Sequence, residues 1–232
     1  MAVWLNLGSG TLPLEGFTNV DALPDAPGVD LVADISQPLP FADGSVNLIY
    51  AVHLLEHFAT DDVPALLADW RRVLAPGGKV LIAVPDLDTI ARMLIDREGW
   101  FTPPHSPWVG AIYGGQKDEY DFHKTGFTEP WLAWLLDQAG FGDIRRVDRF
   151  AEVGANDASH SPLPFGKNVS LNMTGTVGGA PLPQADLAGR RIERAFDALD
   201  RPLSYALTVS TSLRARAMGR RRRRLEQHLR RA

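Results

Sequence analysis

Five short apolar segments lie within the first 84 residues, and they constrain the fold of this chain more than any other feature. They are AVWLNL, FTNV, VDLVAD, VNLIYAV and KVLIAV, and two weaker ones, IRRVDRF and NVSLNM, follow much later. Short, dense apolar runs bounded by turn residues are typical of strands that are buried in a parallel sheet. The sequence therefore predicts an α/β fold with a mostly parallel, seven-stranded sheet that ends in an antiparallel hairpin.

Helical patterns are fewer than such a sheet normally requires. Residues 61–74, 87–96 and 130–139 have apolar side chains at helical spacing, and Thr128 precedes the last of them as a candidate N-cap. The links between the first four apolar segments are short and carry no helical pattern, although parallel strands are usually joined by a crossover helix. We therefore expect several helices to be missing from the N-terminal half. A lid or the C-terminal tail would then cover the bare sheet face.

The chain is expected to form one domain with an appendage. Residues 1–183 would be the domain, with a lid inserted around 98–127, a long stretch rich in glycine, proline, histidine and aromatic residues. Residues 184–232 have an amphipathic pattern and an arginine run, Arg220–Arg224, and would form a helical, Arg-rich extension. For this tail we leave open a solvated helix end, a peripheral contact with an anionic membrane, and a homodimer contact.

Composition excludes several classes of function. The formal net charge is −4 although arginines cluster at the end of the chain, so the body is acidic and we expect no nucleic-acid partner. There is no cysteine, which excludes disulfides, a thiolate nucleophile and Cys-ligated metal sites. The sequence shows no signal-peptide pattern and no apolar run that approaches the ~20 residues of a membrane span. A cytoplasmic protein is expected.

The stretch WLNLGSGTLPLEGFTNVD indicates a nucleotide-like ligand. Gly8 and Gly10 follow the first predicted strand and let the backbone approach a ligand, while Asp21 ends the next strand, where a carboxylate can accept ribose hydroxyl hydrogen bonds. The dinucleotide fingerprint requires a third glycine and a following helix, and neither is present here. A nicotinamide- or flavin-dependent oxidoreductase is therefore disfavoured.

The motifs LNLGSG, NVD, VADISQPLPFADGSVNLIYAVHLLEHF and WRRVLAPGGKVLIAVP occur in this order. Together they resemble the class I S-adenosylmethionine-dependent methyltransferases, in particular the type 11 branch and a group within it associated with glycan biosynthesis. The resemblance runs from about Val3 to Val84, continues through residues 113–141 and fades after Met173. It implies a Rossmann-like fold, S-adenosyl-L-methionine as cofactor and transferase activity.

The resemblance also implies roles for single positions around the cofactor. Gly8, Ser9 and Gly10 would pass under its methionine portion, and Asp21 would hold the ribose hydroxyls. Asn6 stands where the family usually has an acidic residue, so its contact with the methionine amino group is altered.

Further implied contacts come from the ends of the third and fourth predicted strands. Asp34 would reach the adenine amino group and Ile35 would pack on the ring. Ala51, Val52 and His53 would face the sulfonium and the acceptor.

Methyl transfer to a hydroxyl needs help in removing its proton, from a general base or a bound divalent ion such as Mg²⁺. The sequence offers His53, His57 and His123 as bases, with Asp121 orienting His123 or binding the metal. A pocket-wall role for His53 and a solvated loop around residues 118–123 are the alternatives. Glu56 and His57 belong to the LEH motif, and a structural role is favoured for both.

The predicted function is the transfer of a methyl group from S-adenosylmethionine to a hydroxyl of a small acceptor, with a saccharide as the expected class. This carbohydrate assignment comes from the resemblance and from the aromatic residues of the lid, which can stack on sugar rings or cover the sheet. The alternative is a catalytically degenerate binding module that docks to a membrane or partner through its basic tail.

Overall fold

The computed structural model describes residues 2–95, 107–159 and 168–182, which lie in one compact unit, Met1–Leu182. The helical extension expected over 184–232, and with it the membrane and dimer contacts of the tail, lies outside the described residues. The described part contains no helix that is long and apolar enough to cross a membrane.

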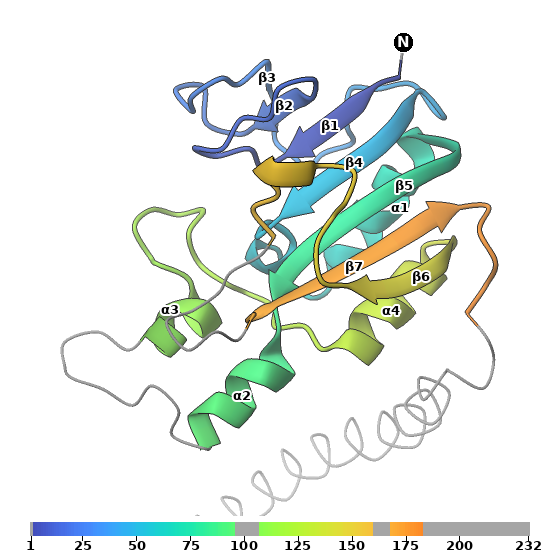
Figure 1. The fold of residues 1–232 in the computed structure, drawn as a ribbon. Helices are drawn as coiled ribbons and strands as arrows, with labels where there is room; N and C mark the ends of the chain where they lie inside the picture. Colours follow the sequence, from blue (N-terminus) through green and yellow to red (C-terminus); the bar gives the residue numbers. More distant parts are fainter. Residues whose placement is uncertain (1, 96–106, 160–167, 183–232) are drawn as a thin grey trace, which may run out of the picture. The chain divides into compact units, whose positions relative to one another are not determined.

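The seven-stranded sheet is confirmed. Its strands are β1 (Trp4–Leu7), β2 (Thr18–Asp21), β3 (Leu31–Val32), β4 (Val46–Val52), β5 (Leu74–Pro85), β6 (Phe141–Val147) and β7 (Ser170–Val177). They are arranged in the order β3-β2-β1-β4-β5-β7-β6, and only β7 runs antiparallel to its neighbours (Figure 1). The order reverses between β1 and β4, which is where open α/β sheets bind ligands at the carboxyl ends of their strands.

One face of the sheet is covered by the two longest helices of the described part, α1 (Val63–Val73) and α4 (Glu129–Gln138). Their buried side chains, including the fully buried Trp70 and Leu132, pack with the alternate residues of β1, β4 and β5 in the main core. Both helices were predicted, and Thr128 stands at the N-cap of α4, although its side chain makes no capping bond.

The opposite face lacks helices in the N-terminal half, as predicted. The links 8–17, 22–30 and 33–45, all within the described part, contain turns and bends but no helix. This face is packed instead by Leu14 and Phe17 from the first link and by Phe150 and Val153 from the segment after β6. Figure 1 shows that segment, in gold, crossing in front of the sheet. Within the described residues, the sheet is thus covered by these loop residues, rather than by the lid.

A pair of buried asparagines orders the first link in place of a helix. The Asn6 amide donates to the side-chain oxygen of Asn19 at 2.9 Å and to the carbonyl oxygen of Leu12 at 3.1 Å. Asn19 in turn accepts from the Leu14 amide at 2.8 Å and donates to Asp30 at 3.0 Å. Because buried polar groups must be hydrogen-bonded, this network holds the loop against β1 and β2.

The region between β5 and α4 is more regular than the sequence suggested. Helix α2 (Leu87–Ile95) follows β5 as predicted, but a further short helix, α3 (Pro107–Tyr113), lies inside the stretch that was expected to be irregular. Ala111 and Ile112 of α3 pack with Ile90 and Met93 of α2 in a small apolar cluster. Residues 114–127 then return to the end of β4.

Candidate active site

Gly8 adopts a left-handed backbone conformation at the end of β1. Its φ is +65°, and its N–H and that of Ser9 both donate to the carbonyl oxygen of Val20, at 2.8 and 3.1 Å. A Cβ atom at Gly8 would lie 2.7 Å from Cδ1 of Leu54. The positive φ favours glycine here, and a side chain would in addition force the Leu54 side chain, in the segment after β4, to move. The close approach places the glycine turn directly against residues 53–57.

Gly8→Ala is expected to destabilise the fold by about 1–2 kcal/mol through the left-handed backbone alone, and to displace Leu54 in addition. Chemical denaturation and calorimetry with S-adenosylhomocysteine measure the two effects separately. Gly16→Ala is the matched control, because Gly16 also has a positive φ of 82°, but a Cβ atom added there would have no neighbour within 4 Å. Equal loss of cofactor binding in both variants would contradict the proposed role of the Gly8–Leu54 contact.

Asp21 ends β2, and its carboxylate accepts hydrogen bonds from two backbone N–H groups. Oδ2 accepts from the Gly10 N–H at 2.8 Å and Oδ1 from the Leu23 N–H at 2.9 Å. Gly10 and Leu23, the two donors, also line a hollow of about 370 Å³ together with Thr11 and residues 24–27. Ligand pockets are roughly 300–1,000 Å³ in volume, so this hollow is large enough for part of a nucleoside.

The buried hydroxyl of Ser9 lacks a hydrogen-bond partner among the described residues. Its side chain is 4% exposed, and its hydroxyl oxygen has no hydrogen-bond partner within the part of the chain that the structure describes. Buried hydroxyls are normally satisfied, so this group is available to a molecule held by the glycine turn.

The other predicted cofactor residues are placed as follows. The amide nitrogen of Asn6 donates within the asparagine network. Asp34 is exposed after β3, and its bonds to Ser36 lower the pKa of its carboxyl, so it is ionised at neutral pH. Ile35 and Ala51 are buried in the main core. Their contacts with a cofactor stay predictions.

His53 follows β4 in a left-handed conformation, with φ of +51°, which turns the chain sharply at the strand end. Its Nδ1 lies 3.2 Å from Oε1 of Glu56, and its Nε2 lies 3.2 Å from the hydroxyl of Ser170 on β7. The ring thus spans β4 and β7. A carboxylate at Nδ1 fixes the tautomer that leaves the Nε2 lone pair toward Ser170.

Glu56 is the centre of this site. It lies in a short 3-10 helix, η1 (Leu55–His57), with none of its surface exposed, and one of its carboxylate oxygens, Oε2, has no hydrogen-bond partner among the described residues. Its backbone carbonyl accepts from the Lys124 and Thr125 amides at 2.8 and 3.1 Å, so it also holds the returning end of the lid.

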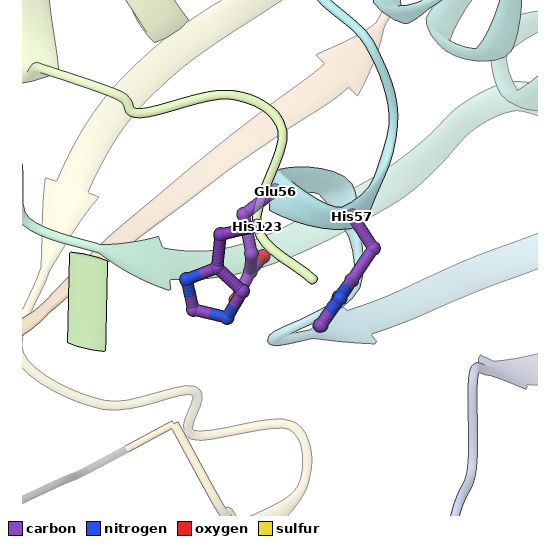
Figure 2. A group of neighbouring side chains, drawn as sticks. All are labelled: Glu56, His57 and His123. Atoms are coloured by element: carbon purple, nitrogen blue, oxygen red, sulfur yellow. The ribbon is translucent and has the colours of Figure 1, made fainter. Parts of the chain in front are cut away.

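His123 arrives from that lid segment, and Figure 2 shows it beside Glu56 and His57. Its Nδ1 lies 3.1 Å from the carbonyl oxygen of Ala111 and its Nε2 lies 3.9 Å from Oε1 of Glu56. The rings of His57 and His123 are 4.8 Å apart, nearly perpendicular. Burial lowers the pKa of His123, against the opposite effect of Glu56, so its imidazole is neutral at pH 7.

The structure brings His53 and His123 together around Glu56 but places Asp121 elsewhere. The Asp121 carboxylate accepts from the backbone N–H groups of Gly115 and Lys117, both at 3.3 Å, and closes a turn within the lid. The partners that orient His123 are Ala111 and Glu56. The sequence analysis favoured a structural role for Glu56 and did not predict its contacts with His53 and His123, for which the only signal was an acid between two histidines in HLLEH.

A second hollow, of about 230 Å³, adjoins His123. Pro85, Leu87 and Ile90 form one side and Ala111–Tyr113 another. It therefore lies between the end of β5, helix α2 and the lid. The site has one hollow beside Asp21 and a smaller one beside His123. His53 and Glu56 lie in the segment that directly follows β4.

Residues 19–82 match the family model described as a methyltransferase domain, Methyltransf_11. This match spans β2 to β5 and includes Asp21, His53 and Glu56. The segment from β2 to β5 therefore matches a methyltransferase domain.

Two curated proteins resemble this methyltransferase domain. A malonyl-[acyl-carrier protein] O-methyltransferase of Alcanivorax borkumensis is 27% identical over 139 residues, which are 60% of this chain and 45% of that protein. An uncharacterized 37.1 kDa protein in transposon TN4556 of Streptomyces fradiae is 36% identical over 64 residues, 28% of this chain and 18% of that protein. The chain thus spans less than half the length of these curated relatives.

Among solved structures, the domain is similar to a SAM-dependent methyltransferase from Thermotoga maritima that is described as a possible histamine N-methyltransferase. The two are 17% identical, the match covers 76% of this chain and 82% of that chain, and the TM-score is 0.48.

Proposed function

We propose that this protein transfers a methyl group from S-adenosylmethionine to a hydroxyl group of a small acceptor. The observation that carries the proposal is the direct packing of the glycine turn against the segment that bears His53 and Glu56. Leu54 lies between them in sequence and touches Gly8 in space. A cofactor held by the turn would therefore lie next to a histidine–carboxylate pair.

The residues of the turn fit the cofactor. Asp21 is held in place by two backbone donors and keeps lone pairs for ribose hydroxyls, and the unpartnered Ser9 hydroxyl faces a buried environment. The bound cofactor supplies a methyl group on a sulfonium sulfur, which is a reactive donor by itself. The task of the protein is then to align the acceptor and to remove its proton.

His53 is the candidate general base. Glu56 would accept a hydrogen bond from the Nδ1 N–H, so that Nε2 carries the lone pair; this nitrogen now faces the Ser170 hydroxyl, and a bound acceptor hydroxyl would take that place and give Nε2 its proton. The side chain of His53 is 36% exposed, so a small molecule can reach it, whereas that of Glu56 is buried. As the oxygen bonds to the methyl carbon, the carbon–sulfur bond breaks and its electron pair stays on sulfur.

The acceptor would occupy the hollow beside His123. The described lid carries three exposed aromatic side chains, Tyr113, Tyr120 and Phe122, at 43–56% exposure. Of these, Tyr113 lines the hollow beside His123, and exposed apolar side chains next to a hollow are typical of a binding surface. Such rings can stack on the faces of a sugar, which supports a saccharide as the acceptor class.

A methyl-transfer assay tests this function. Full-length protein, S-adenosylmethionine labelled in its methyl group, and a panel of mono- and disaccharides, phenols and amines are incubated together, and S-adenosylhomocysteine release is measured. We expect turnover with a hydroxyl acceptor and a labelled ether product that resists alkaline hydrolysis. Turnover confined to amines, or no binding of S-adenosylhomocysteine, would contradict the proposal.

A further inference from the structure

The Glu56 carboxylate is buried and incompletely bonded, and two histidines surround it. Oε2 has no hydrogen-bond partner in the described part, although burial of a carboxylate oxygen without one is costly. We propose that Glu56, His57 and His123 bind one divalent cation of the zinc type. The inference rests on the methyl-transfer function above only for the role of the cation and not for its binding.

The three side chains can offer ligand atoms to a common point. One atom from each, the carboxylate oxygen and a nitrogen of each imidazole, lies within 4.8 Å of the others. Figure 2 shows the group gathered beside η1, with His123 contributed by the lid. In a tetrahedral zinc site, bonds of ~2.0–2.2 Å place ligand atoms roughly 3.4 Å apart, so small side-chain rotations would complete the site.

Both histidines are already oriented as metal ligands. His57 Nδ1 lies 3.2 Å from the carbonyl oxygen of Phe122, and His123 Nδ1 lies 3.1 Å from that of Ala111. A carbonyl can only accept, so each Nδ1 carries a proton and each Nε2 carries a lone pair. Metal-bound histidines almost always donate their second N–H to a carbonyl or carboxylate in this way.

With both histidines protonated at Nδ1, the cluster has more hydrogen-bond acceptors than donors. The lone pair of His123 Nε2 lies 3.9 Å from Oε1 of Glu56, which His53 also contacts, while Oε2 has no hydrogen-bond partner among the described residues. A proton on this nitrogen would satisfy one acceptor only. A cation would bind the two nitrogens and the carboxylate together, and would also compensate the buried negative charge.

The donor set selects the kind of cation. Two imidazoles and one carboxylate suit zinc and neighbouring transition metals, whereas Mg²⁺ prefers oxygen ligands. Three protein ligands leave a fourth position open, as in catalytic zinc sites. An acceptor hydroxyl bound there would lose its proton more easily, and that proton would pass to His53 as the oxygen–methyl bond forms.

Metal content tests the site. Full-length protein, freed of metal by a chelator, is dialysed against micromolar ZnCl₂ and its zinc is measured by mass spectrometry, without S-adenosylmethionine or acceptor. We expect about one bound zinc per chain. His57→Asn and Glu56→Gln should weaken zinc binding by more than the ~10–100-fold that loss of an outer-shell partner costs.

Glu152→Gln is the matched control, because its carboxylate pairs with Lys79 at 2.7 Å and is not part of the cluster, so zinc binding should be unchanged. If Glu56→Gln does not fold, zinc binding is tested with the variant of the half-buried His57. The visible absorption of cobalt-loaded protein then shows whether the metal has the expected ligands. S-adenosylhomocysteine binding is measured in parallel and should persist in His57→Asn. No zinc in the wild type, equal zinc in the variants, or displacement by equimolar Mg²⁺ would overturn the proposal.

Discussion

Asp21→Ala is expected to abolish measurable binding of S-adenosylhomocysteine. Hydrogen bonds to charged groups contribute about 1.5–3 kcal/mol each, so loss of two ribose contacts corresponds to at least about a hundredfold weaker binding. The substitution also releases the Gly10 and Leu23 amides, which the carboxylate holds at 2.8 and 2.9 Å. Gly10 and Leu23, which line the hollow beside Asp21, would then no longer be held in place. Isothermal calorimetry gives the dissociation constant directly.

Asp43→Ala is the matched control for this experiment. Its carboxylate is exposed and pairs with Arg72 at 2.8 Å, a surface ion pair that contributes ~0–1 kcal/mol. It should bind S-adenosylhomocysteine as the wild type does. Asp21→Asn should also bind weakly, because an amide nitrogen would face one of the two backbone N–H donors. Wild-type affinity in either Asp21 variant would contradict the assigned role of this carboxylate.

His53→Asn is expected to lower kcat by roughly 10²–10⁴-fold, the usual contribution of a general base, while S-adenosylhomocysteine binding stays within a few fold. Asparagine keeps a polar group at a position with positive φ, which it tolerates better than most residues. The backbone bond from residue 53 to the carbonyl oxygen of Ala83 is preserved. Steady-state kinetics with the best acceptor of the panel measures the effect.

Ser170→Ala separates catalysis by His53 from simple packing. It removes the hydroxyl near Nε2 but leaves the ring oriented by Glu56, so we expect less than a tenfold change in kcat. A loss in Ser170→Ala as large as in His53→Asn would show that the β4–β7 contact matters more than proton transfer. An unchanged kcat in His53→Asn would remove the general base from the proposed mechanism.

The sequence predicted the sheet, and the positions of Gly8, Gly10 and Asp21 at strand ends, because both depend on local features. Dense apolar runs identify buried strands, and the helical periodicity of 61–74 and 130–139 identifies α1 and α4. Gly8, Gly10 and Asp21 stand at strand ends, where topology alone brings them together. The short links likewise predicted that helices would be missing.

What covers the bare face could not be read from local pattern. Phe150 and Val153 come from beyond β6 and pack with Tyr50 and Leu81 across the sheet, at large separations in sequence. The short helix α3 was also missed, because seven residues are too few for a periodic signal. The bond from the Asn6 amide to Asn19 was likewise not visible in the sequence, because it joins two strands, and the contact of Asn6 with the cofactor stays a prediction.

By itself the sequence determined the α/β class, the position of the glycine turn and the family, because these follow from strand patterning and from motifs close together in the chain. Only the tertiary structure decided which groups share the acceptor side. Glu56 and His123 are 67 residues apart, and the return of the lid onto η1 brings their ligand atoms within 3.9 Å. Glu56 is fully buried where the lid returns, and only the fold shows that one of its carboxylate oxygens is left without a hydrogen-bond partner among the described residues.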